Sequence, residues 1–201
     1  TASFENKTTQ LIQLEKLYDD RAVLSRAQWR MWFMDQLYPE SSAYNQAFTF
    51  RIHGEFNLEL LDIAICSLIN RHNVLRNRFT IVEGYPQIQR ESPLVNILQT
   101  VDISEGSSVI ERANELVEEH ASRPFAMSRD LLVRALFVKT AKREGLFSFV
   151  THHAVFDGSA PVFFTQLADL YQKLVKRQLL LIESNTWQYD DYAAWEEKWI
   201  E

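Results

Sequence analysis

The sequence contains few of the residues that cross-link or interrupt a chain. Its 201 residues include one cysteine, five glycines and five prolines. The lone Cys66 excludes an internal disulfide, suits a reducing compartment, and lies in an apolar stretch that indicates an ordinary buried residue. So few glycines and prolines argue against a loop-rich all-β protein. The alternation of helical and strand patterns instead predicts an α/β fold.

A basic surface and a long apolar run are also missing. The chain has 21 basic and 27 acidic residues, a formal net charge of −6, which argues against a nucleic-acid partner. No run reaches the roughly 18 apolar residues of a membrane span, and the N-terminal residues lack the pattern of a signal peptide. We therefore expect no membrane partner and a cytoplasmic location.

Apolar periodicity is what the sequence does contain, with 46% hydrophobic residues. Spacings of three and four predict helices over 8–19, 25–37, 57–73, 107–122, 159–178 and 188–201. Alternation and β-rich runs predict strands over 44–53, 76–82, 86–90, 96–102, 131–140 and 146–153, with turns at 83–84 and 141–145. In the last helix, an aromatic stripe is expected to face the core: Tyr189, Tyr192, Trp195 and Trp199. Residues 1–20 are expected to be a lead-in to a domain over 21–201.

The most informative stretch is Thr-His-His-Ala-Val-Phe-Asp-Gly, at 151–158. Neighbouring side chains of a strand leave on opposite faces, so His152 and His153 cannot both reach the same cavity. For the same reason they cannot share a metal ion, and no third ligand is suitably spaced, so no metal site is expected. Gly158 permits a turn, which places Asp157 at a strand-to-helix corner where its carboxylate can lock the chain with a cation.

Five segments in order resemble the condensation domains of nonribosomal peptide synthetases. They are Leu-Ser-Arg-Ala-Gln-Trp-Arg-Met-Trp-Phe at 24–33, Asn-Arg-His-Asn-Val-Leu-Arg-Asn-Arg-Phe at 70–79, the 123–136 stretch from Arg-Pro-Phe to Arg-Ala-Leu, the double-histidine motif, and Gln-Tyr-Asp-Asp-Tyr-Ala-Ala-Trp at 188–195. The resemblance implies a chloramphenicol acetyltransferase-like lobe, with a mixed or antiparallel sheet flanked by helices.

The resemblance also assigns roles to the residues of the double-histidine motif. His153 matches the family's functional histidine, which either accepts a proton from the attacking amine or holds that amine in place; the sequence leaves both roles open. His152 is expected to be structural, and Asp157 to pair with Arg76 and so fix the corner. Gly158 is expected to shape the backbone there and to offer an amide donor near the reacting carbonyl.

Ser25, Gln28 and Ser159 are candidates for the wall of the substrate tunnel. Ser159 and Ala160 stand where the family often has Trp and Ser, which leaves the usual acceptor preference in doubt. The family joins substrates held on phosphopantetheine arms, so donor and acceptor peptidyl carrier proteins and neighbouring synthetase domains are the expected partners, with no cofactor bound directly.

Length is the main departure from the family pattern. Family members have two lobes with the active site between them, and this chain matches the first, so we expect the isolated 201 residues to be inactive. The alternatives are an epimerization, ester-forming or other acyltransferase domain, or a non-catalytic lobe that recruits a carrier protein or an oxygenase. The Ser-x-Ala-Gln segment favours condensation over epimerization, and both retained histidines disfavour the heterocyclising branch.

Overall fold

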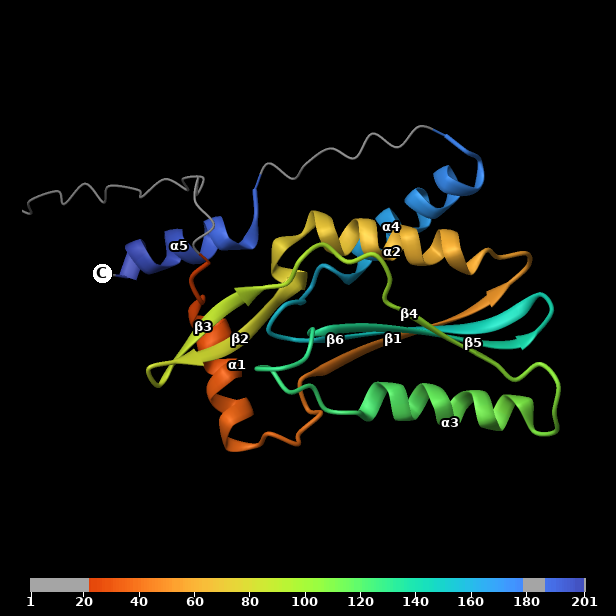
Figure 1. Ribbon diagram of the computed structural model, residues 1–201, viewed down its shortest axis with the longest axis horizontal. Coiled ribbons are helices and arrows are strands. Elements are labelled where there is room, and N and C mark those ends of the chain that lie inside the picture. The colour runs from red at the N-terminus through yellow and green to blue at the C-terminus, as the bar shows by residue number, and fades with distance from the viewer. Residues whose placement is uncertain (1–21, 179–186, 201) are drawn as a thin grey trace, which may run out of the picture.

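The computed structural model describes residues 22–178 and 187–200 (Figure 1). The helix expected over 8–19 and the whole lead-in over 1–20 lie outside the described residues. The elements are α1 (Arg26–Leu37), β1 (Asn45–His53), α2 (Leu58–Arg71), η1 (Asn73–Arg76), β2 (Asn77–Val82), β3 (Tyr85–Arg90), β4 (Leu98–Asp102), α3 (Val109–Ser122), β5 (Val133–Ala141), β6 (Glu144–His152), α4 (Ala160–Val175) and α5 (Tyr189–Ile200).

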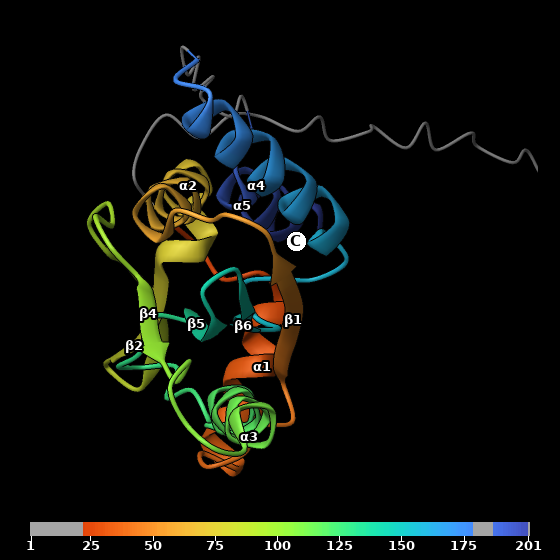
Figure 2. The same cartoon turned by 90° about the vertical axis from the view of Figure 1, so that its right-hand side faces the viewer.

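A four-stranded sheet forms the middle layer, in the order β1-β6-β5-β4. The strands β1, β6 and β5 are antiparallel, whereas β4 runs parallel to β5, so the sheet is mixed as the sequence predicts. Figure 2 shows α2 and α4 over one face of this sheet and α3 over the other. The strand that ends in the double-histidine motif, β6, is central and therefore held on both sides.

Two tight turns set the register of the hairpins. Glu83 and Gly84 join β2 to β3 with φ of 52° and 84°, the paired left-handed conformation of a two-residue turn that matches strand twist. In the β5–β6 hairpin the strands continue farther than expected, to Ala141 and from Glu144. The turn there is two residues long, not the five that the charged segment suggested, because ladder pairing overrides the polar composition of this stretch.

Aromatic side chains fill the space between the sheet and helices α2 and α4. The rings of Phe149 on β6 and Phe163 on α4 stack with centroids 4.9 Å apart, and both are buried. In the same sheet, Phe137 lies so close to Gly145 that a Cβ there would come within 2.4 Å of its ring. Dense packing of this kind fixes the position of β6, because a shift of the strand would make buried rings overlap with neighbouring atoms.

Helix α5 meets the rest of the chain with a face that the sequence did not predict. Asp190, Asp191 and Ala193 are buried, whereas Tyr192 and Trp199 are 41% and 59% exposed. The expectation that the aromatic stripe faces the core is therefore wrong for Tyr192 and Trp199, while Tyr189 and Trp195 are half-buried. The four rings instead form a ladder along the helix, with neighbouring centroids 5.5, 5.9 and 6.0 Å apart.

Two further boundaries differ from the expectations, and both bear on the site. Arg76 closes the 3₁₀ turn η1, in which Leu75 N–H donates to His72 O, and so it precedes β2. The strand β6 ends at His152, one residue before His153. Within 22–178 and 187–200, no helix has the length and apolar character needed to cross a membrane.

Candidate active site

The two histidines stand at the end of β6 with both backbone amides held. His152 N–H donates to Leu132 O and His153 N–H donates to Tyr44 O, each over 2.9 Å, so neighbouring segments grip the chain on both sides. Their side chains then turn to opposite sides. His152 is 4% exposed, whereas the side chain of His153 is 36% exposed and lines an open pocket.

His152 lies among aromatic rings and serves the backbone. Its ring centroid is 6.0 Å from that of Tyr44 and 6.2 Å from that of Phe125. The Nδ1 atom accepts the N–H of Ala154 over 3.1 Å, so the remaining proton of the neutral ring is on Nε2. Burial, with a smaller contribution from His153, lowers the pKa of His152 to about 4. A neutral, hydrogen-bonded imidazole in this position braces the turn after the strand.

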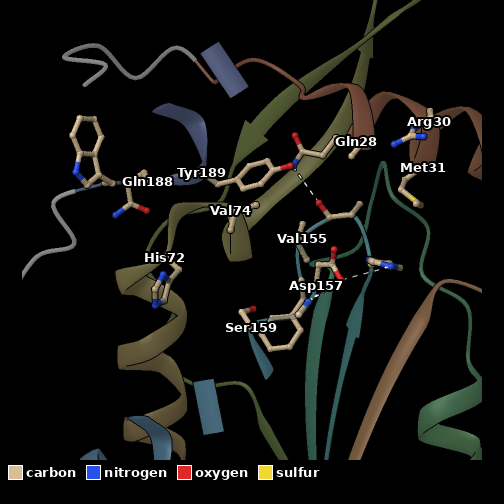
Figure 3. A pocket seen from close by; sticks show the side chains of 16 residues that line it. Gln28, Arg30, Met31, His72, Val74, Val155, Asp157, Ser159, Gln188 and Tyr189 are labelled. Carbon is tan, nitrogen blue, oxygen red and sulfur yellow. Dashed lines mark hydrogen bonds and ion pairs between the residues drawn. The ribbon is translucent and has the colours of Figure 1, made fainter. Parts of the chain in front are cut away.

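The pocket beside His153 has a volume of about 660 Å³ (Figure 3). Arg30 and Met31 of α1 line one side, while His72 and Gln188 lie on the opposite side. The floor is the motif loop from His153 to Ser159. Segments from both ends of the chain thus meet around one imidazole, in a cavity within the size range of small-molecule sites.

Asp157 does not pair with Arg76, contrary to the expectation. Its side chain is 83% exposed, and Oδ1 lies 4.0 Å from His153 Nε2 and accepts the N–H of Gly158 over 2.7 Å. Figure 3 shows this carboxylate turned toward the imidazole. The short Asp157-Gly158 hydrogen bond holds the carboxylate on the pocket side, where it can interact with a protonated imidazole or with a substrate amine.

Arg76 is engaged elsewhere, which explains why that pair is not formed. Its guanidinium donates from Nη1 to Glu91 O over 2.6 Å and from Nη2 to Asn73 Oδ1 over 3.1 Å. Burial, followed by the charge of Arg90, lowers the pKa of Arg76, while Asp190 acts in the opposite direction. Arg76 therefore joins η1 to the end of β3, in a polar cluster whose acid is Asp190 and not Asp157.

Gly158 is not required for an unusual backbone conformation, which corrects a second expectation. Of the described glycines only Gly54 and Gly84 have positive φ, and a Cβ on Gly158 would meet nothing within 4 Å. A small residue at this position instead leaves the pocket open beside Asp157. Ser159, the next residue, lines the pocket and precedes α4 without making a capping hydrogen bond through its side chain.

Ser25 and Gln28 are supporting residues that are each 1% exposed. Ser25 caps α1 and does not line the pocket, whereas Gln28 reaches the pocket wall. Ser25 Oγ accepts Gln28 N–H over 3.2 Å, and Gln28 Oε1 accepts Ser25 N–H over 3.1 Å, which forms a capping box. Only Gln28 of this pair is therefore placed as expected for a tunnel wall.

Several pocket residues were missed by reasoning from sequence, among them Arg30, His72, Trp187, Gln188 and Tyr189. Burial, followed by the charge of Arg71, lowers the pKa of His72 and leaves a neutral ring at the pocket wall. Gln188 and Tyr189 open the 188–195 segment, and that segment was the available signal. No spacing rule could place it opposite His153.

The donor set of this pocket suits proton transfer and hydrogen bonding. Within 22–178 and 187–200, no group of three or more His, Cys, Asp or Glu side chains is arranged to hold a metal ion. An exposed imidazole, a carboxylate 4.0 Å from it and a nearby Arg30 surround the cavity. These groups can bind an amine, accept its proton and stabilise developing negative charge.

Comparison with known proteins identifies the family. The family model described as "Condensation domain" matches residues 18–201. One of the linear gramicidin synthase proteins of Brevibacillus parabrevis is 35% identical over 182 residues, which is 89% of this chain and 4% of that protein. The chain thus belongs to the condensation-domain family, and its curated relatives are much longer synthetases.

Solved condensation domains have the same fold. The starter condensation domain of rhizomide synthetase aligns with a TM-score of 0.81 and 19% identity, over 90% of this chain and 44% of that chain. The X-domain from teicoplanin biosynthesis, in a complex with OxyB, aligns with a TM-score of 0.83 and 23% identity, over 94% and 40% of the two chains. The expected chloramphenicol acetyltransferase-like fold is confirmed, and the chain spans less than half of each of these structures.

Proposed function

We propose that this chain is the N-terminal, histidine-bearing lobe of a peptide-synthetase condensation domain that forms an amide between two carrier-bound substrates. The amine of the acceptor attacks the thioester carbonyl of the donor, a C–N bond forms, and the C–S bond breaks to release the donor carrier's thiol. The proton lost by the amine ends on that thiol or on solvent. The observation that supports this function is that the imidazole of His153 lines an open pocket, whereas that of the adjacent His152 is buried.

His153 is the group proposed to act on the attacking amine. A neutral imidazole can accept the proton as the C–N bond forms, or can hold the amine lone pair toward the carbonyl by a hydrogen bond. Asp157 Oδ1 is 4.0 Å from His153 Nε2, close enough to stabilise positive charge on the ring during the reaction. We propose Asp157 as this electrostatic partner.

The second lobe is proposed to complete the pocket. In this chain the side chains of His153 and Asp157 are 36% and 83% exposed, so water reaches both of the groups proposed to act in the reaction. We expect the 201-residue chain alone to form no amide from loaded donor and acceptor carriers. A polypeptide that continues through the second lobe is expected to form it.

The test compares His153→Ala with the unaltered two-lobed protein, using mass spectrometry of the acceptor carrier to measure the product. Loss of the imidazole is expected to lower the rate by about 100-fold or more, the usual contribution of a positioned acid or base. His53→Ala, at an exposed position on β1, is the matched control and should retain the full rate. Full activity of the His153 variant, or turnover by the 201-residue chain, would refute the proposal.

A second candidate function is partner binding without catalysis. It is favoured by the similarity to the X-domain solved with OxyB, which shows that this fold is found in a complex with another protein. The His153→Ala comparison separates the two. A binding lobe forms no amide before or after the substitution, and retains its partner in both forms.

A further inference from the structure

Helix α5 reaches across the pocket to the beginning of α1. The Tyr189 hydroxyl oxygen lies 2.8 Å from Ser25 Oγ, a contact between residues 164 positions apart. Burial raises the pKa of Tyr189, and Glu196 and Asp157 raise it further against the opposing hydrogen bond from Ser25, so the phenol is uncharged. Because Ser25 is buried, this hydroxyl takes the place that water would otherwise occupy.

From Ser25 the contacts continue to the motif loop. The capping box fixes both the backbone and the side chain of Gln28, whose Nε2 then donates to Ala154 O over 3.1 Å. Ala154 directly follows His153. Figure 3 shows Tyr189 and Gln28 converging above this loop, with the Gln28 amide directed at it. A continuous chain of hydrogen bonds thus runs from α5 to the backbone beside the imidazole.

The α5 end of this chain is itself anchored. Gln188 Oε1 accepts Asn73 N–H over 3.0 Å, and its Nε2 donates to Arg71 O over 3.1 Å. Asp190 Oδ2 lies 2.6 Å from Arg90 Nη2 in a nearly buried ion pair. Tyr189, between these two anchors, cannot move away from Ser25 without breaking them.

We infer that Tyr189 is a positioning residue, whose hydroxyl holds Ser25 and Gln28 so that the backbone after His153 keeps the imidazole directed into the pocket. The expected loss of reaction rate rests on the proposed function, whereas the expected loosening of the backbone after His153 does not. Removal of one oxygen atom at Tyr189 leaves the ring in place and loosens the far end of the chain. A small misplacement of a catalytic group lowers the rate of reaction more than it weakens substrate binding.

The experiment measures kcat and KM for Tyr189→Phe in the two-lobed protein. We expect kcat to fall about tenfold, KM for the acceptor carrier to change less than about twofold, and the melting temperature to change little. A fall in kcat alone indicates that the imidazole is misplaced, whereas a folding defect would also lower the melting temperature. Tyr192→Phe is the matched control, since its hydroxyl bonds to the nearby Glu196 and its side chain is outside the pocket. Gln28→Met should reproduce the loss, and the double variant should lose no more than either single one.

A second measurement distinguishes failure of this inference from failure of the proposed function. Hydrogen exchange at the amides of Ala154 and Val155, in the 201-residue chain, should be faster in Tyr189→Phe than in Tyr192→Phe. Faster exchange without any amide product from the unaltered two-lobed protein would support the positioning role and refute the function. Unchanged exchange, or a Tyr189→Phe enzyme with the original kcat, would overturn the inference.

Discussion

At the scale of single residues, burial separates groups that are chemically alike. His152 and His153 share one backbone segment, yet only His153 reaches the pocket. His120 resembles His152: it is 7% exposed, its Nδ1 lies 3.0 Å from Ser148 Oγ, and burial, with Arg134 and Arg123, lowers its pKa to about 4. Burial therefore favours the neutral ring at both His120 and His152.

These two rings predict a loss of stability in mild acid. In the unfolded chain a histidine binds its proton near the ordinary pKa of 6.5, whereas His120 and His152 in the folded chain resist protonation down to a pKa of about 4. Stability should be full above pH 6.5 and fall as the pH decreases toward 4, by up to about 1.4 kcal/mol per pH unit for each ring. Urea unfolding at several pH values measures this slope.

His120→Gln should give a shallower slope than the unaltered chain, because one of the two neutral rings is gone. Since the variant is compared with its parent at the same pH values, the titration of the carboxylates cancels. A His120→Gln slope equal to that of the parent would contradict the assignment of that ring.

At the scale of elements, α5 is attached largely by polar contacts, and one of these comes from Tyr189 at the start of its aromatic stripe. The buried Asp190 pairs with Arg90 of β3, and burial raises the pKa of this carboxyl against the opposing effect of Arg90. The helix ties the β2–β3 hairpin and η1 to the rim of the pocket. Apolar contacts alone would allow a helix several positions on the surface that it covers, whereas an ion pair specifies one position.

Asp190→Asn should therefore weaken the attachment. Asparagine has the same shape but removes the charge of the short Arg90–Asp190 hydrogen bond, so we expect the free energy of unfolding to fall by about 1.5–3 kcal/mol. Urea unfolding followed by tryptophan fluorescence measures this, because Trp195 and Trp199 belong to the same helix. Asp169→Asn removes the exposed Lys173–Asp169 pair on α4 and should cost about 0.5 kcal/mol or less. Equal effects of the two substitutions would contradict a clamping role for Asp190.

Local patterns predicted most elements because each depends on neighbours in sequence. The cap at Ser25, the β-rich run that ends at the double histidine and the 83–84 turn are of this kind. Polar contacts between distant segments were not predictable. The Arg90–Asp190 bond spans 100 positions, and no periodicity signals that a carboxylate will be buried against it. The expected Asp157–Arg76 pair failed for the same reason, since nearer oxygens occupy the guanidinium.

At the scale of the whole molecule, one outer face is unusually apolar. Trp29, Phe33 and Leu37 recur every fourth residue along α1 and are 40%, 57% and 53% exposed. Tyr38, at the end of the helix, is 62% exposed and extends the same stripe. Contiguous apolar surface of this kind favours association in water.

The 201-residue chain is therefore expected to self-associate as its concentration rises. A double substitution, Phe33→Glu with Leu37→Glu, should shift it to monomer, because charge on the stripe opposes its burial. Sedimentation velocity across a wide range of concentrations measures the change. Val162→Glu, at a 59% exposed position on α4, is the control and should associate as the parent does. Association that survives the double substitution would place the contact elsewhere.

The pairing of remote segments around the pocket also sets an order of events during synthesis. Asn45 pairs with His152, which is 107 positions later, and Ser25 meets Tyr189 only after 164 further positions have been added to the chain. Contacts between residues so far apart in the sequence form slowly, whereas the β2–β3 and β5–β6 hairpins join neighbouring segments. As the chain leaves the ribosome, the hairpins can form first, but the hydrogen bond that braces the loop beside His153 must wait for α5. The hydrogen-bonded wall of the pocket thus forms later than the two hairpins.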